Sequence, residues 1–178
     1  MIASYTVATR MENILMIPII GIQNTMATFA GQNMGARQPE RVSKGLGQGV
    51  LVSLLMTAAL CLCQLLGMEL IIRAFKLDAA AAAICRQHLF ASVLSEPIFA
   101  IYFPANGMFQ GVGEGFHATF YALMALGLRV VFAYSLYRTA FFGYTAIWWS
   151  QAMAWSLTLI TCYAHFFRGK WKEKSLVS

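Results

Sequence analysis

Long runs of apolar residues, separated by short polar segments, follow one another along the whole chain. A membrane-spanning helix needs roughly 20 mostly apolar residues, and five of the runs reach that length. The pattern predicts helices at about residues 6–34, 46–68, 84–109, 116–137 and 144–167. We therefore expect an all-α, polytopic membrane protein with about five transmembrane helices.

Glycine and proline mark the breaks between these runs. Gly35 is a natural stop for the first helix, and Pro39 prevents a simple continuation beyond it. The alanines at 79–83 favour a helix start, and the sequence GVGEG at 111–115 predicts a tight turn between the third and fourth helices. Gly107, Gly111 and Gly115 repeat a small-residue spacing, which predicts close helix packing and a tight cytoplasmic turn.

Composition excludes a soluble domain, because hydrophobic residues make up 59% of the chain and charged residues only 11%. Soluble domains carry about a quarter charged residues. The cysteines contain no C-x-x-C pair, no histidine lies at zinc-binding spacing, and the histidines form no catalytic grouping. The sequence therefore predicts no enzyme, no metal site and no cofactor.

The formal net charge of +6 lies in loops and in the tail rather than in a patch, so no nucleic-acid partner is predicted. The loop at 35–45 and the tail carry more Lys and Arg than the other connectors, which places the C-terminus in the cytoplasm of a cell-membrane protein. An odd number of spans then places the N-terminus outside. That arrangement leads us to expect further helices upstream in a complete protein.

Four sequence segments resemble the multidrug and toxic compound extrusion (MATE) transporters. They are FAGQNMGARQPER at 29–41, GVGEG at 111–115 with LGLR at 126–129, GYTAIWWSQ at 143–151, and FFRGKWKEK at 166–174. They occur in the order of the family's motifs, so the resemblance covers nearly the whole chain. It implies that the chain is the C-terminal part of a MATE-type fold, corresponding to about the eighth to twelfth helices of two six-helix lobes.

The resemblance also implies a function. MATE transporters export cationic, lipophilic small molecules in exchange for H⁺ or Na⁺ by alternating access, so the expected partners are the lipid bilayer, such compounds, and a missing N-terminal lobe or second chain. One alternative is a truncated or non-transporting membrane fragment or subunit. Another is a lipid or oligosaccharide flippase of the same superfamily. Such flippases tend to carry more cationic residues inside the cleft, whereas this chain has only one clear intramembrane cation, Arg129.

Glu96 is the leading candidate for chemistry, because it lies near the middle of the third predicted helix, where a charged side chain is costly. On a helical wheel one stripe, roughly 80° wide, contains Ser92, Glu96, Phe99, Phe103, Asn106 and Gln110. An acid among aromatic rings and amides suits a cleft for lipophilic cations. Arg129 lies within about three residues of the same depth, so Glu96 is expected either to form a structural ion pair with Arg129 or to couple transport by binding an ion.

A second polar stripe follows the first helix. Asn13, Gln23 and Asn24 are expected either to line the cleft or to form hydrogen bonds between helices. On the same helix Ala27, Gly31 and Gly35 form a ridge of small residues that is expected to allow another helix to approach closely. We place Arg10 and Glu12 at the membrane interface, and Tyr144, Trp148 and Trp149 in an interfacial aromatic belt.

Overall fold

The computed structural model describes residues 2–138 and 145–173, and these residues are almost entirely helical. In chain order the elements are α1 (Ile2–Gly35), α2 (Pro39–Ala74), α3 (Ala79–Gly111), α4 (Gly115–Tyr137), α5 (Ala146–Arg168) and the short 3₁₀ helix η2 (Lys170–Glu173). The predicted all-α fold with five long helices is confirmed.

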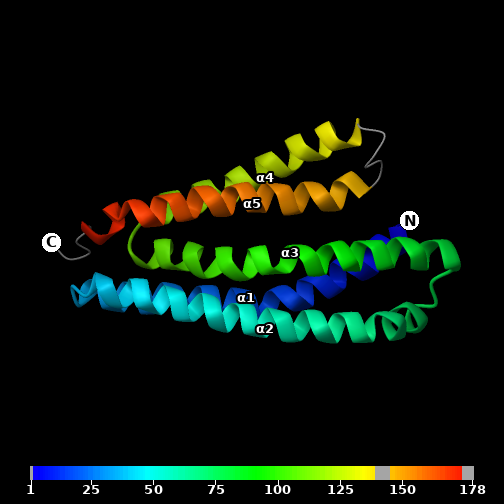
Figure 1. Cartoon of the computed structure of the whole chain (residues 1–178), viewed down its shortest axis with the longest axis horizontal. Coiled ribbons are helices and arrows are strands. Elements are labelled where there is room, and N and C mark those ends of the chain that lie inside the picture. Colours follow the sequence, from blue (N-terminus) through cyan, green and yellow to red (C-terminus); the bar gives the residue numbers. More distant parts are fainter. Residues whose placement is uncertain (1, 139–144, 174–178) are drawn as a thin grey trace.

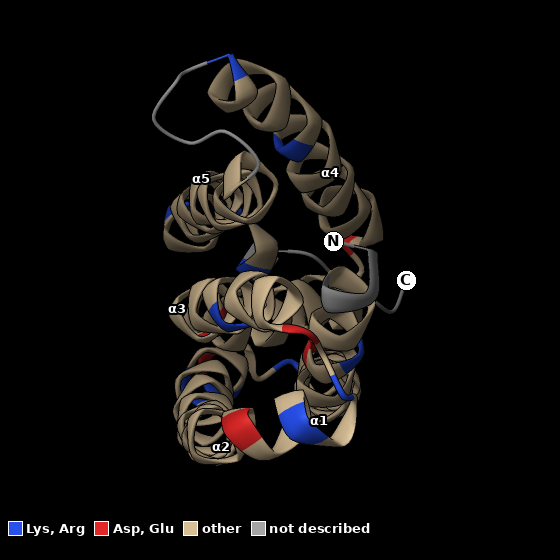
Figure 2. Ribbon diagram, turned by 90° about the vertical axis from the view of Figure 1, so that its right-hand side faces the viewer, with Lys and Arg blue, Asp and Glu red and all other residues tan. Residues whose placement is uncertain are grey.

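Helix α3 is the centre of the bundle (Figures 1 and 2). It packs against α1 and α2 on one side and against α5 and α4 on the other, while α4 and α5 pair with each other. Charged residues are sparse along the ribbons, as Figure 2 shows. This position makes α3 the helix whose polar residues contact the most neighbours.

The helix boundaries follow local chemistry. Helix α1 ends at Gly35, as predicted, and α2 begins directly at Pro39, whose fixed φ suits a first helical turn. The side chain of Asp78 caps α3 by accepting a hydrogen bond of 2.7 Å from the backbone N–H of Ala81. Because of Pro39 and this cap, α2 and α3 begin earlier than the predicted positions 46 and 84.

Large apolar side chains face outward along α2 and α4, including Leu66, Leu70 and Phe116, which are 78%, 72% and 80% exposed. Helix α2 instead buries Ser53, Thr57 and Gln64. A bundle that hides its hydroxyl and amide groups and presents leucine outward is built for lipid rather than water.

Within the described part of the chain, four helices are long and apolar enough to cross a membrane, namely α1 to α4. Helix α5 is not among them, because Gln, Ser, Thr and His residues interrupt its apolar run. The fifth predicted helix is present as α5, and its crossing of the membrane stays a prediction. Its expected first residue, Tyr144, lies outside the described residues.

Glycines set the distance between α1 and α3. A Cβ atom added at Gly107 would overlap the backbone carbonyl of Gln23, and one at Gly111 would overlap the carbonyl of Ala27. A Cβ at Gly31 would lie 3.3 Å from the Gly111 carbonyl oxygen. The predicted close packing is confirmed for Gly31, Gly107 and Gly111, and it fixes the two helices backbone against backbone. It does not hold for Gly35 and Gly115, where an added Cβ would meet nothing within 4 Å because both glycines lie at helix ends.

Two apolar clusters close the ends of the bundle. One contains Phe109, Tyr121 and the fully buried Trp171, and the other contains Ile72, Cys85 and Leu89. At the first end Lys172 forms an ion pair of 2.9 Å with Glu40, so the basic tail lies beside the start of α2. The most polar interior surface lies between the two clusters.

Candidate functional site

A cavity of about 250 Å³ lies between the two apolar clusters, bounded by α1, α3, α4 and α5. Four residues predicted from the sequence line it: Glu96, Arg129, Asn13 and Phe99. The rest of its wall consists of Tyr5, Thr9, Glu12, Met16, Gln151 and Trp155. The polar stripes predicted on the first and third helices therefore meet at this depth.

Glu96 is 1% exposed, and its Oε2 atom has no hydrogen-bond partner among the described residues. None of the ion pairs within 4.0 Å in the described ranges includes Glu96 or Arg129. The direct structural ion pair between these two residues is therefore not formed, although both line the same cavity. A depth match within one helical turn was not sufficient, because α4 makes few contacts with α3.

Aromatic rings form the wall of the cavity beside Glu96. The Phe99 ring meets Trp155 edge-on, with 5.3 Å between the ring centroids, and Phe103 stacks on the same indole at 5.9 Å. Tyr102 also contacts Trp155, at 4.9 Å. Phe103 does not line the cavity itself, and it supports Trp155 from behind. Rings held in this way present a rigid, apolar surface with exposed π-faces.

A smaller pocket of the same polar region contains Ser92, His88, Trp148 and Glu12. Both pockets share Tyr5, Glu12, Arg129 and Gln151 as lining residues. His88 Nε2 lies 3.0 Å from Glu12 Oε1, and the His88 ring stacks between Tyr5 and Trp148. The Glu12 carboxylate therefore lines the cavity with that of Glu96.

The remaining predicted amides do not reach the cavity. Asn106 Oδ1 accepts hydrogen bonds from Gln23 Nε2 at 3.0 Å and from Gln110 Nε2 at 2.7 Å. Asn106 Nδ2 donates to the Tyr102 hydroxyl and to the Ala118 carbonyl, each at 2.9 Å. These bonds join α1, α3 and α4, so the alternative of interhelical hydrogen bonding holds for Gln23.

Asn106, Gln110, Gln23 and Asn24 do not line this cavity, and Asn24 lies exposed on α1. A helical wheel records direction but not depth. Asn106 lies ten residues beyond Glu96, which corresponds to about 15 Å along α3. The stripe therefore runs out of the cavity and into the apolar end of the bundle.

Sequence reasoning missed Glu12, Gln151 and Trp155. Glu12 lies inside the first predicted helix, so the rule that flagged Glu96 as a costly intramembrane acid applies equally to it. Gln151 and Trp155 are four residues apart on α5 and share one face, a spacing that was available in the sequence. Two carboxylates, one guanidinium and several aromatic faces make this cavity suited to binding a cation.

Comparison with known proteins identifies a family and two similar folds. The MatE family model matches residues 1–135. A solved MOP superfamily transporter from Pyrococcus furiosus, described as having a binding pocket of reverse polarity, superposes with a TM-score of 0.82 at 15% identity, over 97% of this chain and 38% of that one. An outward-facing multidrug resistance MATE family transporter gives a TM-score of 0.80 at 16% identity, over 94% and 37%.

This chain thus spans less than two fifths of the length of the transporters whose fold it shares. No curated protein matches it.

Proposed function

This chain belongs to the MatE family, and on that premise we propose that it forms most of one lobe of a secondary active transporter that exports cationic, lipophilic compounds. The match over residues 1–135 and the four membrane-length helices support the transporter assignment. In this proposal the lobe is the C-terminal one, the coupling ion is H⁺ or Na⁺, and the protein lies in the cell membrane with its C-terminus in the cytoplasm.

The observation that carries the proposal is the Glu96 carboxyl group, buried to 1% exposure with an unpartnered Oε2 on the wall of a cavity. An unpaired charge at the centre of a membrane helix costs roughly 3 kcal/mol or more. A bound cation or proton removes that cost. Glu96 therefore favours states in which one or the other occupies the cavity.

The same group explains coupling between substrate and ion. A carboxylate that holds a proton or Na⁺ no longer attracts an organic cation, so the two ligands exclude each other at Glu96. Phe99 and Trp155 contact the apolar body of the substrate and offer cation–π faces to its charge. Exchange then proceeds as these helices rock against the second lobe, which completes the cavity.

Charge in the cavity favours cation export over the flippase alternative. Two carboxylates, Glu12 and Glu96, face one guanidinium, that of Arg129. The similar Pyrococcus furiosus transporter is described as having a pocket of reverse polarity that suggests a different function. We therefore use the charge of the pocket to separate cation export from the flippase alternative. In this cavity the carboxylates outnumber the guanidinium, which favours cation export. The alternative of a non-transporting fragment or subunit differs in export rather than in binding, since such a chain can bind a cation without moving it across the membrane.

The purified chain in detergent tests the proposal directly through binding of ethidium, a fluorescent lipophilic cation. We expect saturable binding that Glu96→Gln weakens at least tenfold. Glu69→Gln is the matched control, because Glu69 is on α2, 52% exposed and paired with Arg86 at the surface. Equal binding by the wild type and the Glu96 variant, or tighter binding of an anionic lipid analogue than of ethidium, contradicts the proposal.

A further inference from the structure

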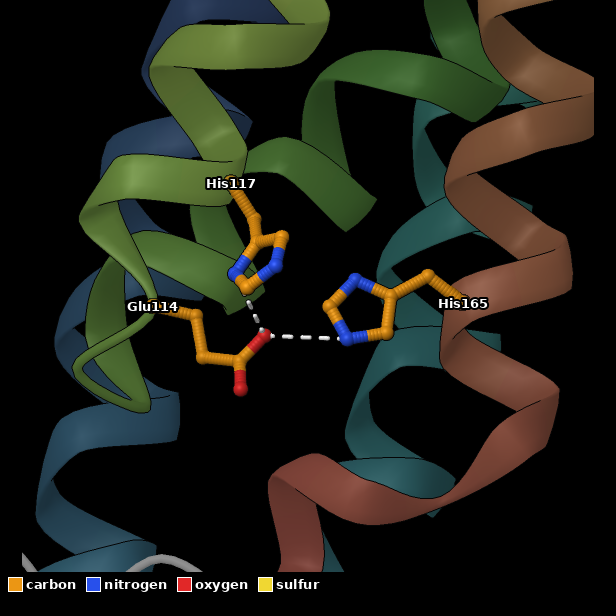
Figure 3. A group of neighbouring side chains, drawn as sticks. All are labelled: Glu114, His117 and His165. Carbon is orange, nitrogen blue, oxygen red and sulfur yellow. Dashed lines mark ion pairs between the residues drawn. The ribbon is translucent and has the colours of Figure 1, made fainter.

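A second cluster of ionisable side chains lies at the turn between α3 and α4 (Figure 3). Glu114 is the residue before α4 and is 5% exposed, His117 follows within the first turn, and His165 lies in the last turn of α5. Glu114 is 18 residues beyond Glu96, which corresponds to about 27 Å along the helix. The cluster is therefore separate from the cavity.

The three side chains converge on one point. Glu114 Oε2 lies 3.2 Å from His165 Nε2 and 3.4 Å from His117 Nδ1, and one such atom from each residue lies within 4.8 Å of the other two. Figure 3 shows both imidazole rings beside the carboxylate. The sequence gives no sign of this group, because His117 and His165 are on different helices and not at zinc-motif spacing.

Neighbouring residues hold His165 in a defined orientation. The Tyr121 hydroxyl lies 2.7 Å from His165 Nδ1, which leaves Nε2 directed toward Glu114. The buried Phe109 ring stacks on the imidazole with 4.8 Å between centroids and an interplanar angle of 14°. Metal-binding histidines typically have such a partner at the second ring nitrogen, which fixes the tautomer and the ring direction.

We propose that Glu114, His117 and His165 bind a divalent transition-metal ion, with Zn²⁺ the best fit. Zinc lies about 2.0–2.1 Å from imidazole nitrogen and carboxylate oxygen, so ligand atoms at tetrahedral angles are about 3.3 Å apart. The observed separations of 3.2 and 3.4 Å match that value. Two nitrogen ligands select against Mg²⁺ and Ca²⁺, which prefer oxygen ligands alone.

The position of the cluster determines how a metal ion reaches it and which helices a bound ion holds together. The His117 side chain is 44% exposed, so an ion can enter from the outside of the bundle and keep a water molecule as its fourth ligand. The bound ion joins the α3–α4 turn to the end of α5. It therefore fastens α4 to α5 at this end, independently of what the cavity transports.

Cobalt binding tests the site on the full chain, purified in detergent and stripped with a chelator. Co²⁺ in a tetrahedral site of nitrogen and oxygen ligands gives visible d–d absorption, and we expect one equivalent to bind without thiolate charge transfer and to be displaced by Zn²⁺. His117→Ala and Glu114→Gln should each weaken binding about tenfold or more. His88→Ala, which removes the third histidine at the other end of the bundle, should leave binding unchanged.

Thermal unfolding gives a second readout. Zn²⁺, but not Mg²⁺, should raise the melting temperature of the wild type and of His88→Ala and leave His117→Ala unchanged. Because His117 is partly exposed, its alanine variant is expected to fold, and its melting temperature without metal checks this. Absence of Co²⁺ absorption in the wild type, or equal affinity in His117→Ala, overturns the proposal and leaves the cluster a contact of one carboxylate with two imidazoles.

Discussion

Substituting Gly107 by alanine tests the packing of α1 on α3 with a single methyl group. The added Cβ would overlap the backbone carbonyl of Gln23 on α1, and its nearest neighbours are backbone atoms rather than the end of a flexible side chain. The two helices must therefore move apart. Overpacking a tight core costs about 1–3 kcal/mol, and the rigid neighbour places this site in the upper part of that range.

We expect Gly107→Ala to lose about 2–3 kcal/mol of unfolding free energy. For a chain of this size 1 kcal/mol corresponds to about 2–4 °C in melting temperature, so the expected fall is about 4–12 °C. Tryptophan fluorescence during heating in detergent measures it, since Trp155 lies in the interior of the bundle.

Gly127 supplies the matched control, because an added Cβ on this α4 glycine meets nothing within 4 Å. Alanine is the better helix former, so Gly127→Ala should be neutral or should stabilise by up to about 1 kcal/mol. A melting temperature of Gly107→Ala within 1 °C of the wild type, or an equal loss in both variants, would refute the backbone-against-backbone packing described above.

Three further substitutions test other parts of the account. Asn106→Ala removes the hydrogen bonds that join three helices and should cost about 2 kcal/mol in thermal unfolding; an unchanged melting temperature would show that the amide cluster is not structural. Trp155→Ala should weaken ethidium binding about tenfold through loss of the aromatic wall, and unaltered affinity would remove that residue from the site. Asp78→Ala should cost about 1 kcal/mol through loss of the α3 cap, with Asp78→Asn close to the wild type; equal losses in both would point to charge rather than capping.

The fold was predictable because the information that defines it is local. Runs of apolar residues give the number of long helices, and Gly35 and Pro39 mark a helix end and a helix start within their own few residues. The start at Pro39 was missed because a charged first turn carries no strong apolar signal. The alanines at 79–83 were expected to favour a helix start but were left outside the predicted range 84–109.

The site was only half predictable. Glu96 and Asn13 line the cavity as expected, because a costly polar residue inside an apolar run is visible in one helix at a time. Phe99 does so because it shares a helical stripe with Glu96. Depth along the bundle and pairing between helices cannot be seen in one helix, so the sequence did not show that Asn106 hydrogen-bonds to Gln23 outside this cavity. It also did not show that the Glu12 carboxylate faces the same cavity as Glu96.

The meeting of His117 with His165 depends on how α4 packs against α5. That contact is a property of the assembled bundle and leaves no trace in sequence spacing.

Competition between ethidium and the coupling ion at Glu96 is the most direct test of the central claim. The measurement is the ethidium dissociation constant of the purified chain across pH and across Na⁺ concentration, for the wild type and Glu96→Gln. Because a carboxylate occupied by H⁺ or Na⁺ no longer attracts the dye, the account predicts that the wild-type constant rises with at least one of these ions, while the variant binds weakly and responds to neither. Wild-type binding that is insensitive to both ions, or a variant that keeps the wild-type dependence, would contradict a cation-coupled transport site at Glu96.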